Sequence, residues 1–262
     1  MIFELEHNVR QKDHAGQGWM FGYKKTIIRW QKDMLTRGWN ALYLENHDQP
    51  RAISCFGDGS LASAKALAVS YMLLRGTPFI YQGQEIGMSN FPFTEITQTD
   101  ATEIKQTYEA LIAEGMIERE ALDKVMVNSR DHSRTPMQWD ASQNAGFTSG
   151  KPWMPIHPDY KEVNTEKSHE LIELYKVLIR LRHEEEDIAR GAIKFWFEQH
   201  LTAFVYERDS FLIITNLGTK KAHLDFNKLE TEGYRHILGS RPRKLEKKMT
   251  FLPWEYQVFK KK

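Results

Sequence analysis

Cysteine is almost absent from this sequence, since Cys55 is the only one among 262 residues. A single cysteine cannot form a disulfide within the chain, so nothing here favours an oxidising compartment. An excess of charge of one sign is absent as well, because 36 Lys and Arg balance 35 Asp and Glu. This balance argues against a nucleic-acid partner or an anionic membrane surface.

Long apolar runs are also missing. No stretch approaches the roughly 20 apolar residues that span a bilayer, and residues 1–7 carry acids where a signal peptide carries Lys or Arg. We therefore expect a soluble, cytoplasmic protein that does not enter a membrane. Aromatic residues are plentiful at 12%, with seven Trp; such side chains mostly fill cores, but they also form stacking surfaces for ligands such as sugars.

The first third of the chain alternates strands and helices. Strand-like patterns cover residues 1–7, 41–44 and 77–81, and helix-like patterns cover 24–37 and 60–74. This order predicts parallel strands with right-handed crossovers, in an α/β layer or barrel. In such sheets the reacting polar groups lie at the carboxyl ends of the strands. Three polar groups occupy these positions here: Glu6-His7, Asn46-His47-Asp48 and Gln82–Glu85.

The rest of the chain divides in two. Residues 88–168 are loop-like apart from helical patterns at about 101–114 and 118–128, and a clear helix follows at 169–183. From about residue 192 apolar residues alternate with a period of two, which is typical of antiparallel strands. We predict two domains, which span residues 1–190 and 191–262.

The stretch Glu45-Asn46-His47-Asp48-Gln49-Pro50-Arg51 directly follows the second strand. A neighbouring His and Asp also occur in metal-dependent phosphohydrolases, but the other histidines show no pair at metal-ligand spacing, so we expect no metal. A purely structural loop capped by Asp48 is the simpler alternative. The sequence contains no Gly-x-Ser-x-Gly elbow and no phosphate-binding loop, and Cys55 is typical of an inert small hydrophobic residue.

A second stretch, Ser129–Asp140, places Arg130 and Arg134 four residues apart in a loop. Arginine can donate two parallel hydrogen bonds to a carboxylate or to vicinal hydroxyls, although a surface ion pair is the alternative. A third stretch, Asn144–Trp153, is a turn-rich loop with two aromatic residues.

Together these stretches resemble the α-amylase superfamily, glycoside hydrolase family 13. Within it the chain is similar to the oligo-1,6-glucosidase and exo-α-glucosidase group, which includes trehalose-6-phosphate hydrolases. The resemblance rests on four segments: Tyr43–Arg51, Gly76–Met88, Arg130–Trp139 and Asn144–Trp153. It implies strands six to eight of a (β/α)8 barrel, with a long insertion after strand eight, followed by a small antiparallel β-sandwich.

The family's nucleophilic Asp lies in a strand-four motif of the form Gly-Phe-Arg-x-Asp, and its acid/base Glu lies on strand five. This sequence contains neither motif. Retaining glycosidases need both carboxylates, so we expect a partner in the form of an N-terminal barrel half, and no hydrolysis by this chain alone. Barrel strands without their neighbours also leave unpaired edges, for which we expect self-association.

The resemblance also assigns roles to residues. Asp48 becomes the transition-state stabiliser that grips ring hydroxyls of the terminal glucose, and His47 donates a hydrogen bond to the same sugar. Arg130 holds hydroxyls at the closed end of the pocket, and Arg134 lies nearby as support or as a further substrate contact. Three residues are expected behind the substrate contacts without reacting: Asn46, Arg51 and Glu85. No cofactor is implied.

Three functions remain open at this point. The chain is expected to be the C-terminal part of a retaining α-glucosidase acting on α-1,6 or α-1,4 bonds at the non-reducing end of gluco-oligosaccharides. The alternatives are a non-catalytic sugar-binding or interaction remnant, and part of a sucrose isomerase, glucosyltransferase or trehalose-6-phosphate hydrolase.

Overall fold

The computed structural model describes residues 18–262, so the strand expected at residues 1–7 lies outside the described part. Contacts between residues divide the chain into two units. Of the described residues, the first unit comprises 18–44, Phe56–Phe79 and Leu174–Lys262, and the second comprises Glu45–Cys55 and Ile80–Glu173. The domain boundary expected after residue 190 stays a prediction.

The first unit contains the two described strands of the predicted parallel sheet. β1 (Ala41–Leu42) and β2 (Thr77–Pro78) pair in parallel, with Ala41 opposite Thr77. α4 (Leu61–Met72) connects them after Ser60, whose side chain accepts a hydrogen bond from Ser63 N at 3.1 Å and caps the helix. The parallel pairing predicted from the order of elements is confirmed for these two strands.

α2 (Gly18–Asp33) precedes β1 and differs from the helix predicted at residues 24–37. It begins earlier because the buried face of Tyr23 and Ile27 continues back to Met20. It ends earlier because residues 34–37 form turns. α7 (His169–Glu184) lies where a helix was predicted, and α8 (Glu186–Ala189) follows it.

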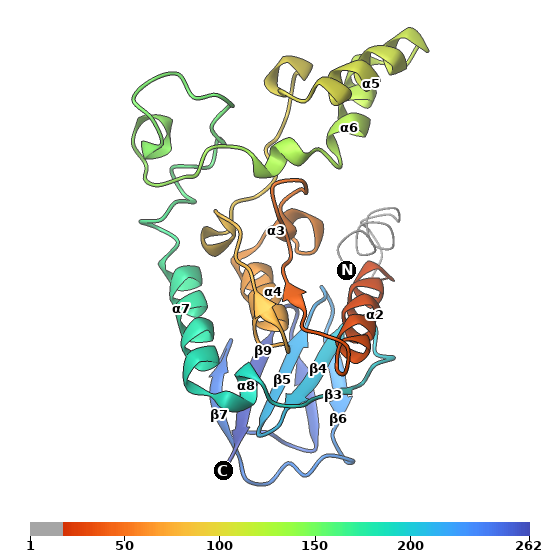
Figure 1. The fold of residues 1–262 in the computed structure, drawn as a ribbon, viewed down its shortest axis with the longest axis vertical. Coiled ribbons are helices and arrows are strands. Elements are labelled where there is room, and N and C mark those ends of the chain that lie inside the picture. Colours follow the sequence, from red (N-terminus) through yellow and green to blue (C-terminus); the bar gives the residue numbers. More distant parts are fainter. Residues whose placement is uncertain (1–17) are drawn as a thin grey trace. The chain divides into compact units, whose positions relative to one another are not determined.

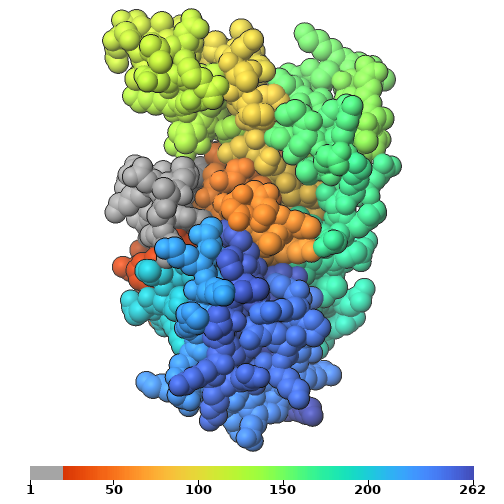
Figure 2. Space-filling view, turned by 180° about the vertical axis from the view of Figure 1, so that it is seen from behind, coloured from red at the N-terminus to blue at the C-terminus, as the bar shows by residue number. Residues whose placement is uncertain are grey.

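The C-terminal strands form two antiparallel sheets, as the period of two predicts. The larger sheet has the order β3-β4-β5-β9-β7, and the smaller one pairs β6 with β8. Figure 2 shows these C-terminal residues, in blue, as one contiguous block of surface. The strand bounds are Ile193–Trp196 (β3), Ala203–Arg208 (β4), Phe211–Asn216 (β5), Ala222–Asp225 (β6), Tyr234–Gly239 (β7), Lys248–Phe251 (β8) and Tyr256–Lys261 (β9).

Each face of the larger sheet packs on a different partner. Val205 and Ile214 belong to a buried cluster with Phe251 of the smaller sheet. On the opposite face Tyr206 donates from its hydroxyl toward the carbonyls of α4 residues Val69 and Ser70, at 3.3 and 3.2 Å, and α4 lies over this sheet in Figure 1. The first unit is therefore a mixed α/β structure whose antiparallel sheet is buried on both sides.

The second unit is built mainly from short helices and loops, and its core includes Phe91, Phe93, Leu122 and Met154. The helices predicted at about 101–114 and 118–128 are confirmed as α5 and α6. Within residues 18–262 no helix has the length and apolar character to cross a membrane. The element bounds are Ala52–Cys55 (α3), Gln84–Ile86 (η1), Ile96–Gln98 (η2), Thr102–Ala113 (α5), Glu118–Met126 (α6), Arg130–Ser133 (η3) and Gln143–Gly146 (η4).

The short parallel sheet leads to a prediction about association. Phe79 directly follows β2 and is 55% exposed, although the apolar run 77–81 is typical of a strand buried on both faces. We expect the purified chain to self-associate reversibly through the surface around Phe79, which sedimentation velocity would measure. We expect Phe79→Lys to weaken this association at least several-fold.

The control is Ile117→Lys, which places the same charge on another apolar side chain that is 62% exposed. A wild-type chain that stays monomeric at high concentration, or equal effects of the two substitutions, would contradict this prediction.

Candidate functional site

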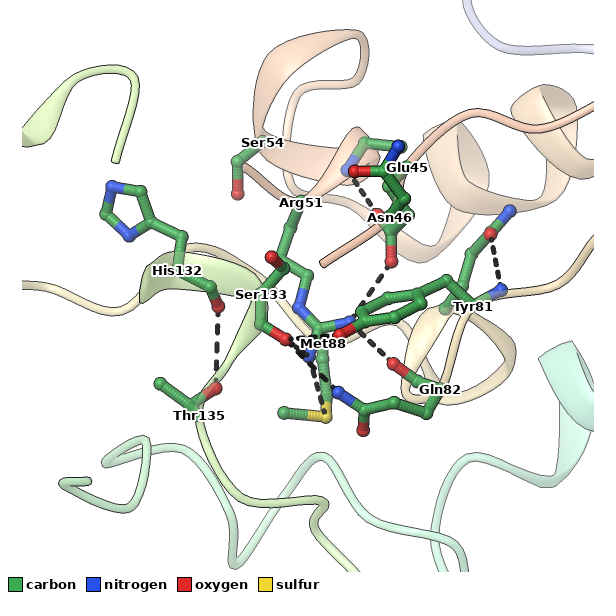
Figure 3. A network of polar contacts seen from close by, with 12 residues as sticks. Glu45, Asn46, Arg51, Ser54, Tyr81, Gln82, Met88, His132, Ser133 and Thr135 are labelled. Atoms are coloured by element: carbon green, nitrogen blue, oxygen red, sulfur yellow. Dashed lines mark hydrogen bonds and ion pairs between the residues drawn. The ribbon is translucent and has the colours of Figure 1, made fainter. Parts of the chain in front are cut away.

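Arg51 is the buried centre of a polar network in the second unit (Figure 3). Its side chain is inaccessible to solvent, and Nη1 lies 3.1 Å from Glu45 Oε1 at the end of the predicted strand 41–44. Nη1 also donates to the carbonyl of Gln82 at 2.6 Å, and the second oxygen of Glu45 accepts from the backbone N–H of Ala52. The guanidinium thus ties the ends of two predicted strands to one point.

The carbonyl of Ser133 brings a third segment to the same network. It accepts hydrogen bonds from Arg51 Nη2 at 3.4 Å, from the Tyr81 hydroxyl at 3.1 Å and from Gln82 Nε2 at 3.2 Å. Figure 3 shows these donors converging on it. Since Arg134 follows Ser133 directly, this convergence also fixes where the Arg134 side chain begins.

Arg134 holds Asp48. Its Nη2 lies 2.7 Å from Asp48 Oδ1, and its Nε donates to the carbonyl of His47 at 2.7 Å. His47 Nε2 lies 3.2 Å from Asp48 Oδ2. The Asp48 side chain is nevertheless 58% exposed, so an imidazole, a carboxylate and a guanidinium meet at a surface that a ligand can reach.

The remaining residues predicted for the site lie around this cluster. Asn46 Oδ1 accepts a hydrogen bond from the backbone N–H of Asp48 at 2.8 Å, which fixes the turn. Arg130 Nη2 instead pairs with Glu103 at 2.8 Å. His132, between the two arginines, is buried against Phe93, and this burial lowers its pKa to about 4.

Glu85 lies partly buried in η1 after Gln82. Its Oε2 is buried with no hydrogen-bond partner among residues 18–262. Burial raises the pKa of Glu85, against the opposing effects of backbone N–H groups and the charge of Arg51. Burial raises the pKa of Glu45 in the same way, again against the charge of Arg51. Two carboxylates therefore compete for one buried guanidinium.

The cluster can bind a polyhydroxylated ligand. Asp48 accepts hydrogen bonds, and the charge of Arg134 keeps this carboxylate oriented. The imidazole of His47 can donate one further bond. In the described part of the chain, no three His, Cys, Asp or Glu side chains are arranged to hold a metal ion. The exposed groups of Asp48 and His47 are hydrogen-bond acceptors and donors of the kind that pair with hydroxyl groups.

Sequence reasoning missed several partners. The sequence analysis gives Glu45, directly after the predicted strand 41–44, no role in the site, although a charged residue at the end of an apolar run is a usable signal. The role of Ser133 depends on its backbone carbonyl, which no side-chain pattern indicates. Glu103 lies on the exposed helix α5, where an acid is ordinary, so its pairing with Arg130 had no signal in the sequence.

Known proteins match most of the chain. Residues 1–191 match the family described as the catalytic domain of α-amylase. The oligo-1,6-glucosidase of Parageobacillus thermoglucosidasius is 40% identical over 237 residues, which are 84% of this chain and 42% of that enzyme. The trehalose-6-phosphate hydrolase of Bacillus subtilis is 34% identical, over 90% of this chain and 45% of that enzyme.

Solved structures agree in fold. The trehalose-6-phosphate hydrolase of Bacillus licheniformis superimposes with a TM-score of 0.86 at 35% identity, covering 91% of this chain and 46% of the other. The trehalulose synthase of Pseudomonas mesoacidophila gives 0.83 at 32% identity, covering 93% and 47%. The chain thus spans about half the length of the curated relatives it matches.

The buried ion pair between Arg51 and Glu45 predicts a large loss of stability when the Arg51 side chain is replaced. Arg51→Met leaves Glu45 buried without its counter-charge, and we expect it to lower the free energy of unfolding by about 3–5 kcal/mol in urea titrations. Arg119→Met is the control, because its exposed pair with Asp123 is worth at most about 1 kcal/mol. Equal losses for the two variants would show that the Arg51 network does not stabilise the fold.

The raised pKa of Glu85 predicts a pH-dependent effect of Glu85→Gln. Between the unfolded pKa of about 4.3 and the higher folded pKa, the folded wild type binds a proton that the unfolded chain lacks. Its stability therefore falls as pH rises through this window, whereas the Gln variant escapes that loss. We expect the melting temperature of Glu85→Gln to rise relative to wild type from about pH 4 toward neutral pH.

Exposed Glu114→Gln serves as the control for this series. A raised pKa of Glu85 is contradicted if the difference in melting temperature between Glu85→Gln and wild type does not change with pH, or if it changes in the opposite direction.

Proposed function

The chain belongs to the α-amylase family of glycoside hydrolases, and from this membership we propose that it acts as the C-terminal part of a retaining α-glucosidase. Its substrates are gluco-oligosaccharides, cleaved at the non-reducing end at α-1,6 or α-1,4 bonds. The proposal extends to this chain the activity that its relatives' names state, and we place the protein in the cytoplasm.

The observation that carries the proposal is the Asp48 cluster. A half-exposed carboxylate held at 2.7 Å by Arg134, with His47 beside it, is fixed in direction and open to a ligand. A loop cap would satisfy its carboxylate with neighbouring N–H groups. Here Asp48 is instead held by an arginine 86 residues away in the sequence, which is an arrangement suited to gripping a substrate.

Each residue then has a role in the proposed reaction. Asp48 accepts hydrogen bonds from ring hydroxyls of the terminal glucose, and these bonds strengthen as the ring flattens toward an oxocarbenium ion. His47 donates to the same ring, and Arg134 orients Asp48. Arg130 holds hydroxyls at the closed end of the pocket, which requires it to exchange Glu103 for substrate.

The reacting carboxylates are proposed to lie in an N-terminal barrel half. The sequence contains no Gly-Phe-Arg-x-Asp motif, and Asp48 is proposed to support a nucleophile rather than to replace one. Loss of a nucleophile costs many kcal/mol of transition-state stabilisation. We therefore propose that the 262-residue chain binds sugar without hydrolysing it.

A second reaction class shares the same residues. Structures of a trehalulose synthase and an isomaltulose synthase match this chain with TM-scores of 0.89 and 0.85, against 0.86 for the trehalose-6-phosphate hydrolase. Isomerisation and hydrolysis differ in whether the released fructose or water attacks the glucosyl-enzyme. Product analysis on sucrose separates them, since hydrolysis yields glucose and fructose while isomerisation yields a new disaccharide.

The test joins this chain to the part of the Parageobacillus oligo-1,6-glucosidase that lies upstream of its match. We expect the fusion to hydrolyse p-nitrophenyl α-glucoside and isomaltose, and the 262-residue chain alone to hydrolyse neither. Asp48→Asn in the fusion should lower kcat/KM by about 10²–10³-fold, because it removes a charged contact that is strongest in the transition state.

The matched control is Asp123→Asn, which removes an exposed, paired carboxylate on α6 and should leave kcat/KM within about twofold. Turnover by the chain alone, or a folded fusion in which Asp48→Asn is harmless, would refute the proposal.

A further inference from the structure

A pocket of about 360 Å³ lies in the second unit, lined in part by Tyr81, Glu85 and Arg134. Its volume falls within the range of about 300–1,000 Å³ that is typical of small-molecule sites. Asp48 and His47 are not among its lining residues. Arg134 belongs to both places, so the pocket adjoins the Asp48 cluster while being formed by different side chains.

Three aromatic side chains form the apolar part of the wall. Trp139, Phe147 and Trp153 all line the pocket, and all three are exposed, Trp153 to 60%. They come from one segment of 15 residues, 139–153. Several large apolar rings left in water around one concavity indicate a binding surface, because scattered single exposures are the ordinary case.

The segment that carries these rings is braced. Asn144 and Ala145 both adopt a φ of 55°, and Gly146 follows with a φ of 67°. Ala145 is fully buried, and its carbonyl accepts hydrogen bonds from the N–H groups of Trp139 and Asp140. Left-handed backbone at a residue such as Ala145 costs about 1 kcal/mol or more. Such strain is common where a loop must hold a ligand surface in place.

The polar part of the pocket contains an unsatisfied acceptor and a cation. Glu85 is one of the lining residues, and its Oε2 is buried without a hydrogen-bond partner in the described part of the chain. Arg134 contributes its guanidinium, which already bonds Asp48 and the His47 carbonyl. A ligand hydroxyl that donates to Glu85 would remove the cost of a buried, unpaired polar atom.

We propose that this pocket binds one glucose ring of an α-gluco-oligosaccharide, with an apolar face of the ring on Trp139 and Trp153 and a hydroxyl donating to Glu85. The choice of sugar rests on the proposed function. A pyranose ring combines a flat C–H face with a rim of hydroxyl donors, which matches aromatic walls beside a buried acceptor. A purely apolar ligand would leave Glu85 unsatisfied, and an anionic ligand would be repelled by it.

The pocket therefore constitutes a sugar subsite distinct from the Asp48 cluster. Because Arg134 belongs to both, a longer oligosaccharide can have one ring at the aromatic wall while another ring lies at Asp48.

The test uses the 262-residue chain and isomaltotriose, with binding followed by isothermal titration and by shifts of the Trp indole N–H signals in NMR spectra. We expect Trp153→Ala to weaken binding about tenfold, as the loss of one stacked aromatic ring does. Glu85→Gln should weaken binding by a similar factor, because a charged acceptor becomes neutral. Sorbitol, which has no ring face, should not bind.

Trp39→Ala is the matched control, since Trp39 is 45% exposed and lies in the other unit; it should bind isomaltotriose like the wild type. Asp48→Asn should keep the Trp153-dependent binding, which separates this subsite from the catalytic proposal tested by hydrolysis in the fusion. The subsite is refuted if isomaltotriose does not bind, if Trp153→Ala with an unchanged melting temperature binds like wild type, or if sorbitol binds equally well.

Discussion

The arrangement of the site depends on one buried guanidinium. Arg51 bonds Glu45 at one strand end and the carbonyl of Gln82 at another, and it reaches the carbonyl of Ser133 in a segment more than 80 residues away. Ser133 is followed by Arg134, which orients Asp48. Because arginine offers five donors in a rigid fork, one side chain can fix three segments at once. A lysine at position 51 would supply the charge without that geometry.

Burying the carboxylates of Glu45 and Glu85 near Arg51 has an electrostatic cost. Glu45 and Glu85 both have a raised pKa, because burial disfavours their charged forms more than Arg51 compensates. A buried ion pair often stabilises a fold no better than apolar residues of the same volume would. The benefit here is directional, since an apolar cluster could not set the carbonyls of Gln82 and Ser133 at defined angles.

The sequence predicts well which segments form helices and strands and where the polar residues of the site lie, because both depend on short-range patterns. The strand predicted at 41–44 is observed as Ala41–Leu42, and the helix predicted at 60–74 is observed as Leu61–Met72. The parallel pairing of β1 with β2 follows from the order of the elements. The acidic partners of Arg130 and Arg134 cannot be predicted from such short-range patterns. Arg130 and Arg134 lie four residues apart in one loop-like stretch, and only the path of the chain in space brings Glu103 to the first and Asp48 to the second.

The heptapeptide 45–51 shows why exposure matters for the chemistry. Its ends, Glu45 and Arg51, are buried, whereas His47 and Asp48 at its middle face water. A unit charge 4 Å from another interacts by about 1 kcal/mol in water but about 4 kcal/mol where the effective dielectric constant is near 20. In the proposed function, an Asp48 exposed in this way would only weakly stabilise a developing positive charge. The proposed reaction therefore requires a further surface that closes over Asp48 and excludes water.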